Sequence, residues 1–196
     1  MVGSSILPVA YHKGELYFLF GKENPMEDSQ KGYSDFGGRV EKGESLEDTA
    51  MREGSEEMTG FLGNEKELRK LVQKNGGLYP IHFNDTYHVH IFCIEYDSNL
   101  PKYYNYNHAF LWKKMDTKVL NDTKLFEKIE INWFTPSQIS SRKTEFREFY
   151  REIIDKVLSE LPQIKKFICK RNNKYLTKRQ YTKKVYTTNT RKNEIV

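Results

Sequence analysis

Three glutamates in the first third of the chain have the spacing that a metal site on a helix requires. Glu53, Glu56 and Glu57 are three and four residues apart, so on a helix they would share one face. Carboxylates this close repel one another, and a hard divalent cation relieves the repulsion. Because no Cys/His cluster accompanies them, these oxygen ligands favour Mg²⁺ or Mn²⁺ over zinc, and such a cation would also bind phosphate oxygens.

The residues before the glutamates distinguish this pattern from an ordinary acidic helix. Arg52 can reach toward Glu56 or back to Glu44, and its guanidinium can orient a carboxylate through two hydrogen bonds. The alternative interpretation is a solvated acidic face. The preceding Gly38, Glu44 and Arg52 argue against that alternative.

The order of these residues resembles the Nudix box, the signature of the Nudix hydrolases. The box consists of a glycine, five residues, a glutamate, seven residues, Arg-Glu, two residues and Glu-Glu, and the chain matches it from Gly38 to Glu57. Gly54 departs from the usual aliphatic residue and Thr59 from the usual glycine. Neither change removes a carboxylate. The departures therefore concern helix packing, where Gly54 would let the helix approach a sheet closely.

The resemblance implies a fold and a reaction. The fold is a Nudix-type α/β/α sandwich with a mixed sheet, extending to about residue 161. In the reaction, two or three divalent ions bridge the glutamates and a pyrophosphate while a water attacks one phosphorus. The substrates of the family are nucleoside diphosphates linked to another group, and the protein mainly positions the reacting parts.

The resemblance also implies roles for individual residues. An additional glutamate on a loop opposite the helix commonly acts as base or ligand, and the candidates are Glu127 and Glu130. We prefer Glu130, because it lies three residues before Trp133 in a segment that looks like the strand entry after that loop. The remaining expected roles are metal binding by Glu53, Glu56 and Glu57, completion of the coordination shell by the carbonyl of Gly37 or Gly38, assistance by Glu44, orientation by Arg52, and substrate contact by Lys22, Arg39 and Glu127.

The patterning along the chain predicts alternating strands and helices. Hydrophobic and β-branched runs predict a hairpin from 6–11 and 15–20 and strands from residue 78, over 86–96, 109–113 and 130–134. Three- and four-residue periodicity predicts helices over 44–60, 65–74 and 144–161. Polar composition predicts loops over 21–33 and 101–108. The strand at 86–96 is expected to be central in the sheet.

Charge is distributed unevenly between the two ends of the chain. Residues 165–196 carry 11 Lys/Arg and one acid, a net charge of +10, whereas the remainder carries 21 basic and 26 acidic residues. We therefore expect a hydrolase domain over 1–161 and a basic C-terminal extension over 162–196 that contacts a polyanion such as RNA. Tyr175, Tyr181 and Tyr186 add rings that can stack on bases. A disordered solubilising extension is the alternative.

Hydropathy and cysteine usage indicate the compartment. No segment approaches the roughly 18 apolar residues that cross a bilayer, and the first residues lack a signal-peptide pattern. Cys93 and Cys169 lie far apart, which suits a reducing environment. We expect no membrane association and a cytoplasmic protein, with the nucleus as an alternative.

These observations predict a Mg²⁺- or Mn²⁺-dependent pyrophosphohydrolase, with 5′-capped mRNA as the leading substrate because of the basic extension. Hydrolysis of dinucleoside polyphosphates, ADP-ribose or nucleotide sugars requires the same carboxylates and stays open. A non-catalytic module that binds RNA or a nucleotide is the competing class. Aromatic residues at 103, 104, 106, 110 and 112 are expected mainly to pack, with base stacking as the alternative. His88 and His90 are left outside the site.

Overall fold

The computed structural model describes residues 2–24, 31–123 and 126–169, and its seven described strands form one mixed sheet. The strand order is β3-β2-β1-β6-β5, with β4 paired to β1 and β7 paired to β2. Only the β1–β6 pair is parallel among these. The strands are β1 (Gly3–His12), β2 (Glu15–Glu23), β3 (Tyr33–Ser34), β4 (Phe36–Arg39), β5 (Tyr79–Phe83), β6 (Tyr87–Cys93) and β7 (Lys128–Phe134).

Strands β1 and β2 start as a hairpin and then separate, which opens a wedge in the sheet. Residues 9–12 of β1 pair with β2, whereas residues 3–6 of the same strand pair with β4. Pro8 lies between these two stretches and has no N–H to donate to either partner. The segment 33–39 fills the wedge, with β3 on β2 and β4 on β1. This arrangement brings the two glycines of β4 to the face that α1 covers.

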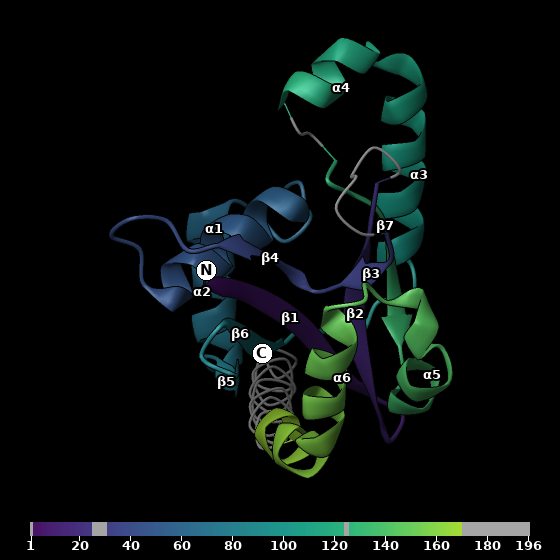
Figure 1. Ribbon diagram of the computed structural model, residues 1–196. Helices are drawn as coiled ribbons and strands as arrows, with labels where there is room; N and C mark the ends of the chain where they lie inside the picture. Colours follow the sequence, from purple (N-terminus) through teal and green to yellow (C-terminus); the bar gives the residue numbers. More distant parts are fainter. Residues whose placement is uncertain (1, 25–30, 124–125, 170–196) are drawn as a thin grey trace, which may run out of the picture.

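Helices cover both faces of the sheet (Figure 1). The first face is covered by α1, α2 and the start of α3, and the second by α5 and α6. The described helices are α1 (Leu46–Glu57), α2 (Glu65–Asn75), α3 (Leu100–Lys114), α4 (Thr117–Thr123), α5 (Pro136–Ser141), the short 3₁₀ turn η1 (Lys143–Glu145) and α6 (Tyr150–Ser159). None of them is long and apolar enough to cross a membrane. The expected α/β sandwich with a mixed sheet is confirmed.

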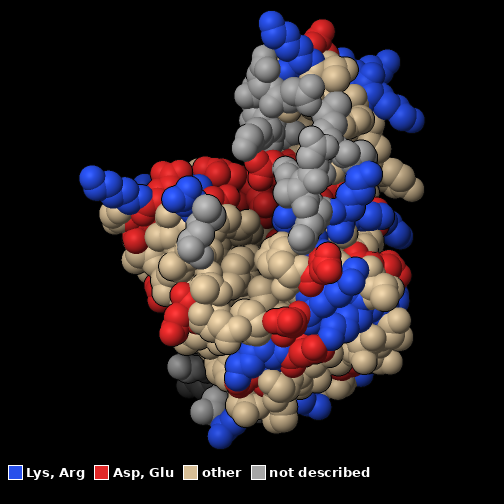
Figure 2. Space-filling model, viewed as in Figure 1, with Lys and Arg blue, Asp and Glu red and all other residues tan. Residues whose placement is uncertain are grey.

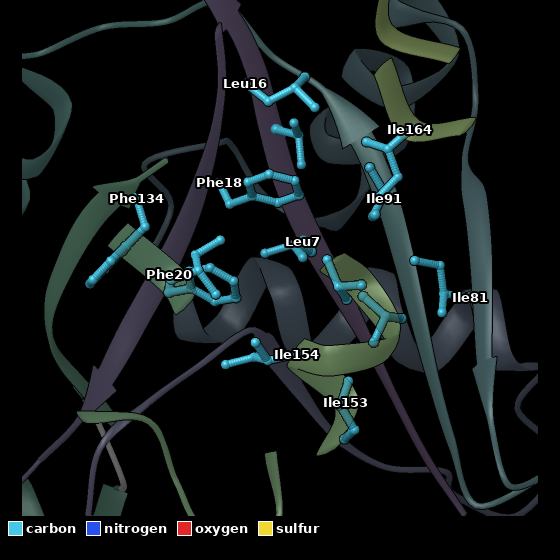
Figure 3. Packing of buried hydrophobic residues seen from close by; sticks show 14 of the residues in the cluster. Leu7, Leu16, Phe18, Phe20, Ile81, Ile91, Phe134, Ile153, Ile154 and Ile164 are labelled. Carbon is cyan, nitrogen blue, oxygen red and sulfur yellow. The ribbon is translucent and has the colours of Figure 1, made fainter. Parts of the chain in front are cut away.

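Each face of the sheet has its own core. On the α6 side, Phe18 and Phe20 of β2 pack with Phe134, Ile153 and Ile154 (Figure 3). On the α1 side, the core includes residues of β1, β4, α1, α2 and α3, among them Ile6, Phe36, Ala50, Leu68 and Tyr104. Alternating side chains of β2 and β7 therefore supply both cores, which explains why these strands have few exposed positions.

The packed body extends beyond the boundary expected at residue 161. Residues 161–169 continue in helical conformation. Ile164 and Ile168 are fully buried in the α6-side core, and Figure 3 shows Ile164 among its side chains. The isoleucine spacing of four residues fits one helix face, which the basic composition of this segment obscured. The rest of the expected basic extension, residues 170–196, lies outside the described residues.

Two local predictions are wrong, and both concern the same segment. The expected loop at 101–108 and strand at 109–113 are a single helix, α3. Pro101 occupies the first turn, where its missing N–H costs nothing. Tyr104 and His108, one turn apart, are buried with ring centroids 3.7 Å apart. Packing of these two rings against Phe61, with ring centroids 5.1 and 6.2 Å away, outweighs the weak helix propensity of the Tyr- and Asn-rich sequence.

The predicted helix at 144–161 begins later than expected. Residues 143–145 form η1, and α6 starts at Tyr150. Between them, Phe146 adopts extended backbone and bridges to Tyr33, and it is buried. The hairpin, the helices at α1 and α2, and the strands β5, β6 and β7 agree with the predicted elements.

Candidate active site

The carboxylate helix α1 begins at a capping box and ends in acidic residues. Ser45 is the N-cap, accepting from the Asp48 N–H at 3.1 Å while Asp48 accepts from the Ser45 N–H. Glu53, Glu56 and Glu57 therefore fall at its C-terminal end, and the last turn has no basic residue. Because the helix dipole is negative at that end, the three carboxylates are electrostatically unfavourable there. A bound cation would offset this cost.

Arg52 connects the glutamates of the box. Its Nε donates to Glu44 Oε1 at 2.7 Å, and its Nη1 donates to Glu53 Oε1 at 2.8 Å. Glu44 also accepts from Thr49, and together these hydrogen bonds lower the pKa of Glu44 to about 2. Glu56 lies 3.5 Å from the same guanidinium. The expected orienting role of Arg52 fits this geometry.

Glu57 is the buried member of the cluster. Its Oε2 accepts from the Gly37 N–H at 2.9 Å, and its Oε1 lies 3.4 Å from Lys128 Nζ. Burial raises the pKa of Glu57 well above its usual range, and Lys128 opposes this only in part because Glu23 and Glu127 add negative charge. Glu57 is therefore a buried carboxylate that one lysine and one backbone N–H contact.

Lys128 is a site residue that the sequence did not reveal. Its ammonium is 1% exposed and contacts Glu23, Glu57 and the Ser34 hydroxyl. Burial lowers the pKa of Lys128, but Glu57 and Glu23 outweigh this effect and the net shift is upward. Arg147 contacts Glu23 at 2.6 Å from the other side. A lysine inside an otherwise strand-like segment was the available signal, but its partners are distant in sequence.

A β-bulge determines where Lys128 points. Lys22 pairs with Glu130, whereas the next residue of β2, Glu23, pairs with Lys128, so Ile129 is the extra residue on β7. The bulge reverses the alternation at this point. Lys128 therefore faces α1, although it lies only two residues from Glu130.

Glu130 is directed away from the carboxylate helix. Tyr33, in the α6-side core, donates to Glu130 at 2.5 Å, and Asn132 also contacts it. Lys22, its partner on β2, lies 3.9 Å away. In contrast, Glu127 acts electrostatically on Glu57. Glu127 therefore adds negative charge at Glu57, whereas the preferred Glu130 is bound by Tyr33 and Asn132, and the expected phosphate contact Lys22 accompanies Glu130.

The glycines of the site allow close approach of β4 and α1. A side chain at Gly38 would overlap the Glu53 carboxylate, and one at Gly54 would overlap Ile6. The close packing expected of Gly54 is therefore present. Gly37 meets Glu57 through its N–H, while the expected carbonyl role of Gly37 or Gly38 stays a prediction. Arg39 is exposed, and its carbonyl accepts from Arg52 at 3.3 Å.

The donor set fits a hard divalent cation. Figure 2 shows acidic side chains gathered over α1 and in the recess beside it. In the conformation described, the carboxylates are turned toward Arg52, Lys128 and Gly37, and no three metal-ligating side chains among the described residues converge on one centre. Glu56 is 61% exposed. The three glutamates lie at one helix end, three and four residues apart, so they are neighbours on one helix face.

A model of the NUDIX domain matches residues 5–157 of the chain. The chain therefore belongs to the Nudix hydrolase family, enzymes that act on phosphoanhydride bonds and generally use divalent metals.

Among known proteins, the chain is similar to Uncharacterized protein L534 of Acanthamoeba polyphaga mimivirus, with 28% identity over 176 residues. The match covers 88% of this chain and 53% of L534, so the chain spans about half the length of that relative.

Similar solved structures include a binary complex of the C. elegans Ap4A hydrolase (11% identity, TM-score 0.43, covering 82% of this chain and 97% of that one). They also include the M. smegmatis Nudix hydrolase RenU (10% identity, TM-score 0.43, covering 85% and 87%). A third is the NUDIX domain of Shewanella oneidensis NrtR complexed with ADP ribose (12% identity, TM-score 0.41, covering 82% and 88%).

Proposed function

We propose that this Nudix hydrolase uses Mg²⁺ or Mn²⁺ to cleave a nucleoside diphosphate linked to another moiety, and that 5′-capped RNA is its substrate. The observation that carries the metal-dependent reaction is the excess of carboxylates at the end of α1. Glu53 and Glu56 lie near Arg52, which also pairs with Glu44, and Glu57 lies near Lys128, which also pairs with Glu23. Hard divalent ions bind such oxygen donors and tolerate few other ligands.

Each residue of the site has a positioning role in this proposal. Arg52 fixes Glu44 and Glu53 through three hydrogen bonds, and Lys128 with the Gly37 N–H fixes Glu57. Glu56, the most exposed of the three, is free to turn toward a ligand. When bound, the divalent ions would neutralise charge developing on the phosphate and activate the attacking water.

Glu127 is the residue that we assign as additional base or ligand. A matched pair of variants tests this assignment, because Glu127 and Glu130 are three residues apart, Glu127 adds negative charge at Glu57, and Glu130 is bound by Tyr33 and Asn132. We expect Glu127→Gln to lower kcat by about 10²-fold or more and Glu130→Gln to change it little. A larger loss for Glu130→Gln would reverse the assignment.

Capped RNA is proposed because of the basic C-terminal residues in the sequence. The test is hydrolysis of a panel containing capped RNA, diadenosine polyphosphates, ADP-ribose and nucleotide sugars, in Mg²⁺ and in Mn²⁺. Glu56→Gln is the control, because that side chain is exposed and its loss should leave the fold intact. Preferred cleavage of a small nucleotide would overturn the RNA assignment. If wild type and Glu56→Gln are equally inactive while both bind RNA, the protein is a binding module.

The contribution of the basic extension is tested by deletion. Because Ile164 and Ile168 are core residues, the deletion begins at residue 170. We expect removal of 170–196 to weaken RNA binding and to flatten its salt dependence, while hydrolysis of small nucleotides stays unchanged. An unchanged salt dependence would exclude the extension from RNA binding.

A further inference from the structure

The outer face of α3 carries three exposed aromatic side chains in one row. Tyr103, Tyr106 and Phe110 are 65%, 75% and 60% exposed, and their spacing of three and four residues places them on one side of the helix. Single exposed aromatics are common on protein surfaces, but a contiguous row points to a binding surface. The expectation that the aromatics of this segment pack is correct for Tyr104, which is buried, and wrong for these three.

Lysines flank the aromatic row on the same helix. Lys102 precedes it, Lys113 and Lys114 follow it, and all three are exposed, while α3 contains no Asp or Glu. Figure 2 shows basic side chains on this projecting part of the molecule, in contrast to the acidic side chains over α1. We call the set of Lys102, Tyr103, Tyr106, Phe110, Lys113 and Lys114 the α3 face.

The buried side of α3 attaches this helix to the active-site region. The Tyr104 hydroxyl lies 2.8 Å from the Glu57 carbonyl oxygen and 3.1 Å from that of Lys128. Asn105 binds the main chain of Ile131 through both ends of its amide, at 2.8 and 3.2 Å. From these attachments α3 extends away from the sheet toward α4 (Figure 1). The α3 face lies on the side of the helix opposite Tyr104, so a ligand bound there would lie on the side of α3 turned away from the carboxylates.

We propose that the α3 face binds single-stranded nucleic acid, with bases stacked on the three rings and phosphates near the lysines. The rings are distributed over about 10 Å of helix axis, from a rise of about 1.5 Å per residue, which is sufficient to stack two or three bases. Positive charge without any acid on the helix favours a polyanion over an apolar protein partner. This inference deepens the proposed function by naming where an RNA substrate is held.

Binding is measured by fluorescence anisotropy with an uncapped, labelled 12-nucleotide oligouridylate and the full chain carrying Glu56→Gln, without metal. The readout is therefore independent of catalysis. We expect Tyr103→Ala/Tyr106→Ala/Phe110→Ala to weaken binding at least about tenfold, because each lost stacking contact is substantial. Lys102→Gln/Lys113→Gln/Lys114→Gln should lower the slope of log K against log salt by roughly 2.

Two control variants distinguish a binding role from a fold defect. Tyr103→Phe/Tyr106→Phe retains the rings and should bind as the parent does. Phe149→Ala removes a partly exposed aromatic from the segment before α6 and should also leave binding unchanged. Equal affinity of the alanine triple variant and the parent would overturn the proposal. The proposal would also be overturned if analytical ultracentrifugation showed that the parent is a dimer and the alanine triple variant a monomer. The α3 face would then join two copies of the chain.

The proposed substrate and the proposed binding role of the α3 face are tested by separate results. Loss of oligouridylate binding in the alanine triple variant supports the α3 face whatever substrate the enzyme hydrolyses. If the panel identifies a small nucleotide as substrate, the proposed function fails and this binding result is unaffected.

Discussion

Lys128 is a buried lysine in a site composed mainly of carboxylates. Its pairs with Glu23 and Glu57 are 1–5% exposed, whereas the Lys22–Glu130 pair on the same two strands is 46% and 35% exposed. Solvent screens the exposed pair, and the buried pair has no such screening. Lys128 therefore contributes more to the free energy of unfolding than Lys22, although each lysine neutralises a glutamate.

Replacing Lys128 by Met removes the cation paired with the buried Glu57, while Glu23 keeps its pair with Arg147. We expect Lys128→Met to lower the free energy of unfolding of the metal-free protein by about 3 kcal/mol. Added Mn²⁺ should restore part of the loss, because it supplies positive charge beside Glu57. Urea denaturation in EDTA and in Mn²⁺ measures both effects.

Lys22→Met is the matched control for Lys128→Met. Because its pair with Glu130 is exposed, the expected loss is below about 0.5 kcal/mol. Equal losses for the two variants would show that burial of Lys128 has no energetic consequence.

Glu44 gives the site an acid-sensitive contact. Hydrogen bonds from Arg52 and Thr49 lower its folded pKa from 4.5 to about 2. The carboxylate therefore stabilises the fold above pH 4.5, and this contribution is lost as the pH falls toward 2. We expect Glu44→Gln to melt at a lower temperature than wild type at pH 7, with the difference narrowing between about pH 5 and about pH 3. A constant difference over that range would contradict the assignment.

At the scale of elements, the approach of α1 to β1 depends on a glycine. Gly54 lies over Ile6, which is fully buried, and a Cβ at this position would overlap the Ile6 side chain. Glycine at this position therefore costs about 1 kcal/mol in helix propensity, but it allows close contact between the helix and the sheet. This contact sets the distance between the carboxylates of α1 and the glycines of β4.

Gly54→Ala tests that contact. Overpacking costs about 1–3 kcal/mol and exceeds the gain in propensity, so we expect a net destabilisation of about 1 kcal/mol. In an Ile6→Val background the overlap is smaller, and the same substitution should cost at least about 0.5 kcal/mol less. Urea denaturation of the four proteins measures this coupling. Additive effects would show that the two side chains do not compete for space.

At the scale of the whole molecule, the two cores depend on segments far apart in sequence. Residues 161–169 return to the sheet and bury Ile164 and Ile168 against the α6-side core. A domain boundary at residue 161 would remove both side chains. Any test of the basic extension therefore has to preserve these nine residues.

Ile164→Ala measures the contribution of this segment. We expect a loss of about 3 kcal/mol, because a fully buried isoleucine leaves a cavity. Gln163→Ala, at the exposed neighbouring position, should change the stability by less than about 0.5 kcal/mol. Thermal or urea unfolding of both variants provides the comparison. Equal stability of the two would show that the core ends before residue 164.

The sequence was sufficient to predict features that depend on residues close together in the chain. Helical spacing placed the glutamates on α1, and the offsets from Gly38 to Glu57 identify the family. These features depend on residues within about one helix of each other. Short-range geometry is therefore enough to predict them.

The tertiary structure decided the features that depend on distant partners. Contacts of Tyr104 and His108 with Phe61 make α3 a helix against its propensity, and one bulged residue in β7 turns Lys128 toward Glu57 while Glu130 faces Tyr33. A single added residue reverses the alternation of a strand, and no local pattern marks where it occurs. The carboxylates were therefore readable from the sequence, whereas their buried counter-ion and their neighbouring glutamate were set by how the strands pair.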